Sequence, residues 1–237
     1  MPRIDARDAN ELRPVRMTLG YQRFAEGSVL IELGRTVVLC AVTMEERVPG
    51  FLKGSGEGWV TAEYSMLPRS TLTRTGRERR GGRVEEIQRL VGRSLRAATN
   101  LSALGERQMI VDCDVIQADG GTRTAAITGA YVALYQAFHN LRKTGVLRVN
   151  PLTSMIAATS VGLVDGVPLL DLCYEEDFRA QVDFNVVMTD RKEFVELQAT
   201  AEHRAFTKND IDGLLALAQS GIEKLFQLQH LALRELA

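Results

Sequence analysis

The chain has 237 residues, of which 45% are hydrophobic and 25% charged, and its formal net charge is −1. This is the composition of an ordinary soluble globular protein, long enough for one large domain or two small ones. No apolar run approaches the roughly 20 residues that a membrane helix needs. The first 14 residues also lack the apolar middle of a signal peptide, so we expect a cytoplasmic protein with no membrane partner.

The cysteines and histidines exclude several kinds of chemistry. Each of the three cysteines (Cys40, Cys113 and Cys173) lies in an apolar, strand-like stretch. We therefore expect buried reduced thiols in place of disulfides or a zinc site. The three histidines are scattered, with no pair at ligand spacing and no serine or cysteine beside a plausible base. Nucleophilic catalysis and histidine-bound metals thus lose most of their support.

The chain begins with a polar segment that we expect to be frayed. Apolar residues at 27–33 and 36–42 then flank Gly34 and Arg35, which predicts a tight hairpin. The glycine-rich stretch at 51–59 lacks the Lys-Ser/Thr ending of a phosphate-binding P-loop, so we interpret it as a flexible loop.

The stretch 66–83 is too polar and too interrupted by glycine to present a core face, and it predicts a long exposed loop. From 69 to 96 nine arginines face three glutamates, without a single lysine. Since arginine binds phosphate with a planar, bidentate fork, this local excess of six positive charges indicates a phosphate-bearing partner despite the nearly neutral chain.

A helix follows the arginine-rich loop. Its apolar residues repeat at three and four positions and form one buried stripe: Ile87, Leu90, Val91, Ser94, Leu95 and Ala98. Arg89, Arg93 and Arg96 share another face, which we interpret as a solvated surface or a subunit interface. Glu85 and Glu86 could pair locally with Arg89.

The segment QADGGTRTAAITGA at 117–130 joins a half-buried strand at 109–116 to a helix that runs to about Lys143. Gly120 and Gly121 form the turn, and Thr122 is placed to cap the helix. Free amides, the positive end of the helix dipole and the bidentate donor Arg123 would converge there, as a site for an oxyanion. The alternative is a plain turn with Arg123 as a solvated charge.

Four further strands are predicted at 155–164, 167–174, 181–189 and 193–200, with turns at Asp165–Gly166 and at 190–192. Thr207 and Asp210 form a plausible capping box for the last helix. Its inner stripe comprises Ile211, Leu214, Leu215, Ala218, Ile222, Leu225 and Phe226. Hairpins followed by helices, without an obvious linker, predict mixed α/β (α+β) layers in one domain over 1–237.

Carboxylates offer ligands for a divalent cation. Glu175, Glu176, Asp177 and Asp183 lie close in sequence, and a turn could bring Asp177 and Asp183 to one sheet edge. Two such carboxylates could hold a hydrated Mg²⁺, which keeps several waters. Asp112 and Asp114 are a weaker candidate pair, and acidic loop residues are commonly just solvated.

Several long blocks of the sequence resemble the ribonuclease PH family of phosphorolytic exoribonucleases. These blocks are EYSMLPRST at 63–71, EIQRLVGRSLRA at 86–97, residues 103–134, LLDLCYEED at 169–177 and VDFNVVMT at 182–189. The resemblance implies a fold like the second domain of ribosomal protein S5, assembled as a homohexamer of three dimers. It also implies an enzyme that trims the 3′ ends of transfer RNA precursors.

The resemblance further implies roles for individual residues. Arg83, Gly121, Thr122 and Arg123 would bind inorganic phosphate. Asp177 and Asp183 would serve catalysis, together with Arg123, and would hold Mg²⁺. Arg69, Arg74 and Arg77 would engage the RNA.

Bound phosphate would then be the nucleophile, so that no serine, cysteine or histidine is required and nucleoside diphosphates are released. The reverse reaction would add nucleotides to RNA. Two alternatives remain, namely a silent RNA-binding subunit of an exosome-like ring and a metal-dependent hydrolytic nuclease. The sequence departs from the family in its short ERRGG segment at 78–82 and in His203, where a glycine is usual.

Overall fold

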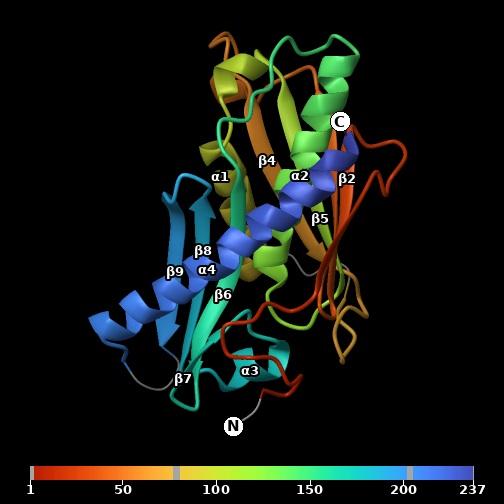
Figure 1. The fold of residues 1–237 in the computed structure, drawn as a ribbon. Helices are drawn as coiled ribbons and strands as arrows, with labels where there is room; N and C mark the ends of the chain where they lie inside the picture. The colour runs from red at the N-terminus through yellow and green to blue at the C-terminus, as the bar shows by residue number, and fades with distance from the viewer. Residues whose placement is uncertain (1–2, 77–80, 202–204, 237) are drawn as a thin grey trace.

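The computed structural model describes residues 3–76, 81–201 and 205–236, which form two β-sheets and four α-helices (Figure 1). The first sheet has the strand order β1-β2-β3-β5-β4, and only the β4–β5 pair is parallel. Its strands are β1 Val15–Leu19, β2 Gly27–Leu33, β3 Thr36–Glu45, β4 Trp59–Met66 and β5 Gln108–Gln117.

The second sheet is antiparallel throughout and has the order β7-β6-β8-β9. Its strands are β6 Ile156–Val164, β7 Val167–Leu170, β8 Val182–Thr189 and β9 Phe194–Ala201. The helices are α1 Gly82–Ala97, α2 Thr122–Lys143, α3 Tyr174–Arg179 and α4 Lys208–Leu233. Among the described helices, none is long and apolar enough to cross a membrane.

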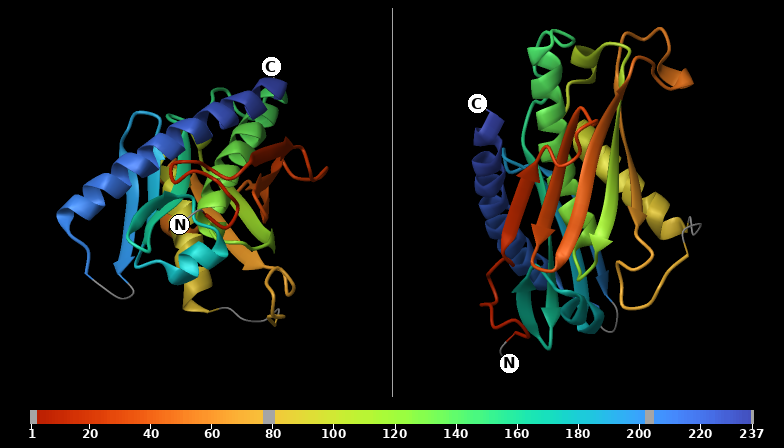
Figure 2. Two further views of the ribbon diagram at one scale, coloured as in Figure 1. Left: turned by 60° about the horizontal axis from the view of Figure 1, so that its bottom comes forward. Right: turned by 90° about the vertical axis from the view of Figure 1, so that its right-hand side faces the viewer.

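Helix α2 is the centre of the molecule. It packs against β2 and β3 of the first sheet and against β6 of the second, while α1 covers β4 and α4 crosses β6 (Figures 1 and 2). Most of its residues are buried, which explains why the helix is apolar on all sides. Gly129 permits close packing, because a Cβ there would lie 2.7 Å from Cγ2 of Ile31.

A single hydrophobic cluster includes residues from both sheets and from α1, α2 and α4. All three cysteines are buried and free, as predicted. The hairpin between β2 and β3, the stripe of α1, the turns at Asp165–Gly166 and 190–192, and the capping box of α4 are also confirmed.

Two predictions about elements were wrong, and one strand was not predicted. The described part of the N-terminal segment is held in place, since Arg3 and Arg13 are buried, and it leads into strand β1. The strand expected at 167–174 ends at Leu170, and α3 begins at Tyr174. Strand β4 went unrecognised, although Val60, Ala62 and Tyr64 alternate at period two and all three are buried.

Candidate active site

The parallel pairing of β4 and β5 brings two functional segments to one edge of the sheet. Both strands end there, β4 continuing into the arginine-rich loop and β5 into the turn at 118–121. The amide of Ala118 donates a hydrogen bond of 2.8 Å to the carbonyl of Ser70, which ties the base of the loop to the turn.

The turn before α2 consists of two glycines with positive φ, 75° at Gly120 and 66° at Gly121. A side chain at Gly120 would place its Cβ 2.6 Å from the carbonyl oxygen of Leu172, so the turn packs directly against the start of α3. Gly121 is the N-cap, without a side-chain capping bond. The prediction that Thr122 caps the helix was therefore wrong, since Thr122 is its first residue.

Thr122 is instead paired with a tyrosine from β4. The hydroxyl of Tyr64 donates to Oγ1 of Thr122 over 2.9 Å. Burial raises the pKa of Tyr64, although the Thr122 bond and the charges of Arg83 and Arg123 oppose the increase. The phenol therefore stays protonated, and it fixes the orientation of the Thr122 hydroxyl at the open end of α2.

Arg123 lies between three elements. Its Nη1 donates to Oε1 of Gln198 on β9 over 2.5 Å and lies 3.6 Å from Oε1 of Glu86 on α1. Nε2 of Gln198 also donates to that Glu86 oxygen, over 2.6 Å. The Arg123 side chain is only 17% exposed, so it is not the solvated surface charge of the alternative interpretation.

Asp183 is a mostly buried carboxylate on β8. Burial is the main cause that raises its pKa to about 6, and the charge of Asp177 raises it further. Arg123, a hydrogen bond from Asn185 and Arg83 act in the opposite direction. Arg83, Arg123 and Asp177, which were proposed from the sequence together with Asp183, therefore each lie close enough to Asp183 to act on its charge.

The connection between the two aspartates differs from the expected simple turn. Asp177 lies on α3, and only residues 180 and 181 separate this helix from β8. A divalent cation fits this pair, because it would offset the repulsion and the burial that hold the pKa of Asp183 high. In the described ranges no group of three or more His, Cys, Asp or Glu residues is arranged for metal binding. Two carboxylates suit Mg²⁺, which keeps several of its waters.

The remaining arginines lie at the periphery of the site. Arg83 is exposed at the start of α1, and Arg69 and Arg74 are exposed on the loop. Arg77 lies outside the described residues, as does His203. Arg93 on α1 pairs with Glu196 of β9 over 2.5 Å, and Arg96 lies 4.3 Å from the ring centroid of Trp59 on β4, so this face of the helix is not simply solvated.

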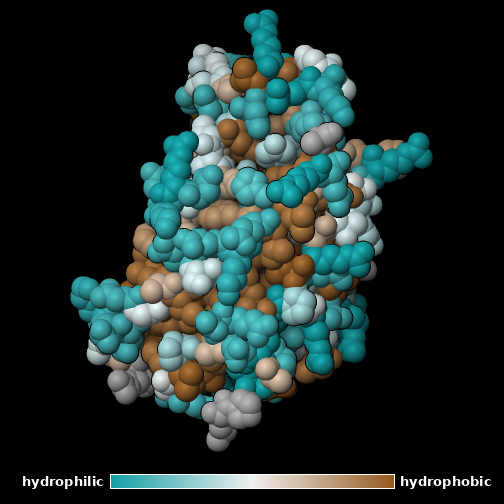
Figure 3. Space-filling view, in the orientation of Figure 1, coloured by the Kyte–Doolittle hydropathy of each residue, from teal (hydrophilic) through white to brown (hydrophobic). Residues whose placement is uncertain are grey.

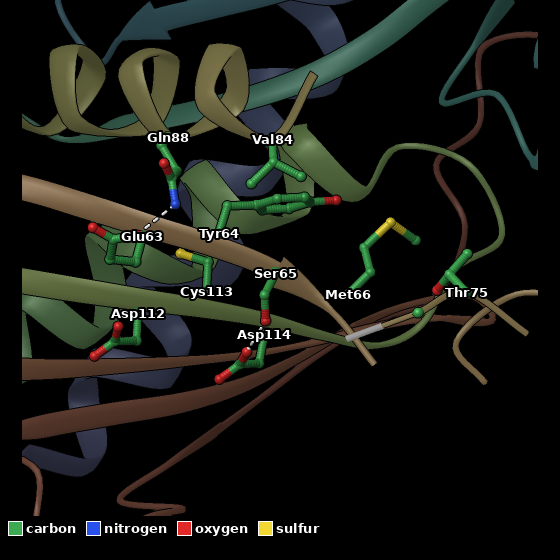
Figure 4. A pocket seen from close by; sticks show the side chains of 11 residues that line it. Glu63, Tyr64, Ser65, Met66, Thr75, Val84, Gln88, Asp112, Cys113 and Asp114 are labelled. Carbon is green, nitrogen blue, oxygen red and sulfur yellow. Dashed lines mark hydrogen bonds between the residues drawn. The ribbon is translucent and has the colours of Figure 1, made fainter. Parts of the chain in front are cut away.

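A cavity of about 570 Å³ lies between the start of α1 and strands β4 and β5, but its chemistry does not suit phosphate (Figure 4). Three carboxylates from β4 and β5 are among the residues that line it: Glu63, Asp112 and Asp114. Burial, followed by the charges of Asp114 and Glu63, raises the pKa of Asp112. The cavity is therefore acidic, and it would repel an anion that the end of α2 would attract.

Sequence reasoning missed four residues of this region: Arg13, Tyr64, Glu86 and Gln198. The alternation within β4 could have placed Tyr64 on a buried face. No local sequence pattern indicates Arg13, Glu86 or Gln198. Their partners lie between 37 and 158 positions away along the chain or on another sheet.

Two models of the 3′ exoribonuclease family match the chain, domain 1 over residues 11–138 and domain 2 over residues 154–221. The chain therefore belongs to the 3′ exoribonuclease family. Within it, the chain is 58% identical to ribonuclease PH of Dehalococcoides mccartyi strain BAV1 over 233 residues, 97% of each protein. It is also 58% identical to ribonuclease PH of Solibacter usitatus over 231 residues, 96% of this chain and 97% of that protein. The resemblance to ribonuclease PH is confirmed.

Solved structures support the mixed α/β fold. A subunit of the Archaeoglobus fulgidus exosome with RNA bound to the active site aligns with a TM-score of 0.83 at 22% identity. That alignment covers 95% of this chain and 91% of the other. Rice Rrp46 aligns with a TM-score of 0.78 at 20% identity, covering 96% and 98%.

Proposed function

We propose that the protein is a phosphate-dependent 3′-to-5′ exoribonuclease that trims extra 3′ nucleotides from transfer RNA precursors and releases nucleoside diphosphates. The observation that carries the proposal is the meeting of an anion-binding helix end and Arg123 with the carboxylate pair of Asp177 and Asp183. Attack by a bound phosphate needs only positioning and charge neutralisation.

Phosphate would bind at the open end of α2. The first amides of a helix have no partner within it, and the helix dipole makes this end attractive to anions. The amide of Gly121, the Thr122 hydroxyl and the guanidinium groups of Arg83 and Arg123 supply the donors. The Gln198 bond uses Nη1 of Arg123, and the fork has further N–H groups on Nη2 and Nε.

In the forward reaction a phosphate oxygen forms a bond to the phosphorus of the last phosphodiester, and the bond from that phosphorus to the 3′ oxygen breaks. A proton then completes the new 3′ hydroxyl. One phosphate linkage replaces another of similar energy, so excess nucleoside diphosphate drives the reverse addition of nucleotides. Arg123, held by Gln198 and Glu86, offsets charge on the reacting oxygens.

Asp177 and Asp183 would hold Mg²⁺, with waters completing its coordination. Bound there, the ion would neutralise charge that develops on phosphoryl oxygens. The exposed Arg69 and Arg74, together with Arg77, would contact the RNA backbone through phosphate.

We also propose that the chain acts as one domain over 1–237, in the cytoplasm, and assembles as a homohexamer of three dimers. The continuous core supports the single domain. Apolar residues gather on the face that α4 crosses (Figure 3), and Leu231 on α4 is 60% exposed. Exposed apolar patches commonly mark subunit contacts. Sedimentation should give six times the chain mass of 26.2 kDa, and a monomer would contradict the assembly.

A silent RNA-binding subunit is less well supported, because Arg83, Arg123, Asp177 and Asp183 are all present and the first three lie close enough to Asp183 to affect its pKa. A hydrolytic nuclease would favour a denser carboxylate cluster than the described residues contain.

The direct experiment uses a transfer RNA with extra 3′ nucleotides and Mg²⁺, incubated with and without inorganic phosphate. Nucleoside diphosphates that appear only with phosphate would support the proposal. Nucleoside monophosphates without phosphate would identify a hydrolase, and the absence of any product would favour a silent subunit.

A further inference from the structure

A cluster of buried charges lies directly behind the phosphate turn. Arg3 and Arg13 come from the N-terminal segment, and Asp171 and Glu176 come from the segment that leads into and through α3. The N-terminal segment and α3 lie side by side in both ribbon views (Figures 1 and 2). Each of these four side chains is at least nine-tenths buried. Because a buried charge is very unfavourable without an opposite charge beside it, these side chains must form ion pairs.

Arg13 and Asp171 form the closest pair of the cluster. Nε and Nη2 of Arg13 donate to the two carboxylate oxygens of Asp171 over 2.9 and 2.6 Å. The backbone amide of Arg13 donates to the same carboxylate over 2.8 Å. This bidentate geometry fixes the plane of the guanidinium group. The edge formed by the N–H groups that do not bind Asp171 faces the turn.

That edge contacts the turn before α2. Nη1 of Arg13 donates to the carbonyl of Asp119 over 2.5 Å, and Nη2 lies 3.4 Å from the carbonyl of Gly120. The hydroxyl of Thr36 donates to the Gly120 carbonyl as well, over 2.7 Å. Both carbonyls of the turn are therefore held from the side of the first sheet.

Holding these carbonyls also orients the amides. A trans peptide unit is planar, and its C=O and N–H point in opposite directions. The Asp119 carbonyl shares a peptide unit with the Gly120 amide, and the Gly120 carbonyl shares one with the Gly121 amide. When Arg13 and Thr36 bind the carbonyls, both amides point away from them. Both glycines have a positive φ, a conformation that glycine adopts without the strain that a side chain would introduce.

The second buried pair holds the other half of the site. Nε and Nη2 of Arg3 donate to Oε1 and Oε2 of Glu176 over 2.8 and 2.7 Å. Glu176 precedes Asp177 on α3. Arg3 also donates to the carbonyl of Asp171 over 3.0 Å, which links the two pairs.

We propose that Arg13 is a positioning residue for the phosphate site: it holds the carbonyls of Asp119 and Gly120 so that the turn presents its amides to inorganic phosphate. Thr36 assists it, and Asp171 fixes its orientation. Arg3 performs the corresponding task for α3 and Asp177. This inference rests on the proposed phosphate-dependent function.

The test measures KM for inorganic phosphate and kcat separately, with the full-length protein. Arg13→Lys keeps the charge but loses the bidentate fork, and it should raise the phosphate KM about tenfold or more with a smaller change in kcat. Thr36→Val keeps the side-chain shape but removes the hydroxyl, which donates to the Gly120 carbonyl and accepts from the Asp119 amide over 3.0 Å. It should raise the phosphate KM about fivefold.

Arg3→Lys is the matched control, because it perturbs an equally buried arginine in the same cluster. It should change the Mg²⁺ dependence or kcat and leave the phosphate KM within about twofold of the wild type. Cooperative urea unfolding of each variant checks that it is folded. If Arg13→Lys does not fold, the phosphate KM of Thr36→Val tests the proposal.

A raised phosphate KM in the Arg13 and Thr36 variants, without such a rise in the Arg3 variant, supports the positioning role. Equal losses of kcat in the Arg13, Thr36 and Arg3 variants, with an unchanged phosphate KM, would overturn it and leave only a structural role. Wild-type enzyme that acts without phosphate would contradict the proposed function itself, independently of the variants.

Discussion

We propose that phosphate binding depends most on Arg123. Its guanidinium is largely buried between α1, α2 and β9, and it lies close enough to Asp183 to oppose the rise in that group's pKa. The substitution Arg123→Ala should lower kcat/KM at limiting phosphate at least about a hundredfold.

The matched control for that prediction is Arg142→Ala, at the opposite end of α2, about 28 Å away at 1.5 Å per residue. Arg142 is exposed, and its variant should keep wild-type kinetics. Both variants should sediment as the wild type does. Unchanged phosphate dependence of the Arg123 variant would refute the assignment of the pocket.

Asp183 should make stability depend on pH. Its pKa is raised from 3.8 to about 6 in the folded protein, so between these values the folded state binds more protons than the unfolded chain. The contribution of Asp183 to the free energy of unfolding is thus fully present below pH 4 and is lost as the pH rises through 6.

The substitution Asp183→Asn removes the titrating carboxyl group, and with it the loss of unfolding free energy at high pH. At pH 7.5 with a chelator, the variant should be more stable than the wild type by about 2 kcal/mol in urea unfolding. The difference should disappear towards pH 4. An equal difference at both pH values would show that another property of the substitution is responsible.

Local sequence indicates the residues of the proposed site, but it does not indicate the residues that support them. The motif at 119–123 contains its own glycines, hydroxyl and arginine, so adjacent positions reveal the helix end. The partners that orient Thr122 and Arg123 come from β4, α1 and β9, and only the fold brings them together.

At the scale of elements, α4 offers a direct test of packing. A Cβ at Gly213 would meet nothing within 4 Å, whereas a Cβ at Gly221 would lie 2.6 Å from Cδ1 of the buried Leu170. Gly213→Ala should raise the free energy of unfolding by about 0.5 to 1 kcal/mol, because alanine favours the helix. Gly221→Ala should lower it by about 1 kcal/mol, since overpacking outweighs that gain. A similar gain in both variants would contradict the close contact of α4 with β7.

Elements with a clear period were predicted well, and elements defined by tertiary contacts were not. The stripes of α1 and α4 repeat every three to four residues and matched the structure. The strand 167–174 was extended too far because LLDLCY is apolar, whereas the chain turns at Asp171, whose φ is 54°. Buried bonds from Arg13 hold Asp171 in that conformation, and no local pattern reveals them.

In the whole molecule two differently built sheets are joined around α2, and we propose that together they assemble one phosphate-dependent site. Strand β5 and α2 contribute the turn, whereas α3 and β8 contribute the carboxylates. The alternation of hairpins and helices predicted mixed layers, but it could not predict that α2 lies between the sheets. That position accounts for the burial of most of the helix.

The most direct test of this claim follows the atoms of inorganic phosphate. The protein is incubated with Mg²⁺, a transfer RNA with extra 3′ nucleotides and ³²P-labelled phosphate, and the released nucleotides are separated. The account predicts nucleoside diphosphates that carry the label in the β-phosphoryl group. Release of unlabelled nucleoside monophosphates at the same rate would contradict it.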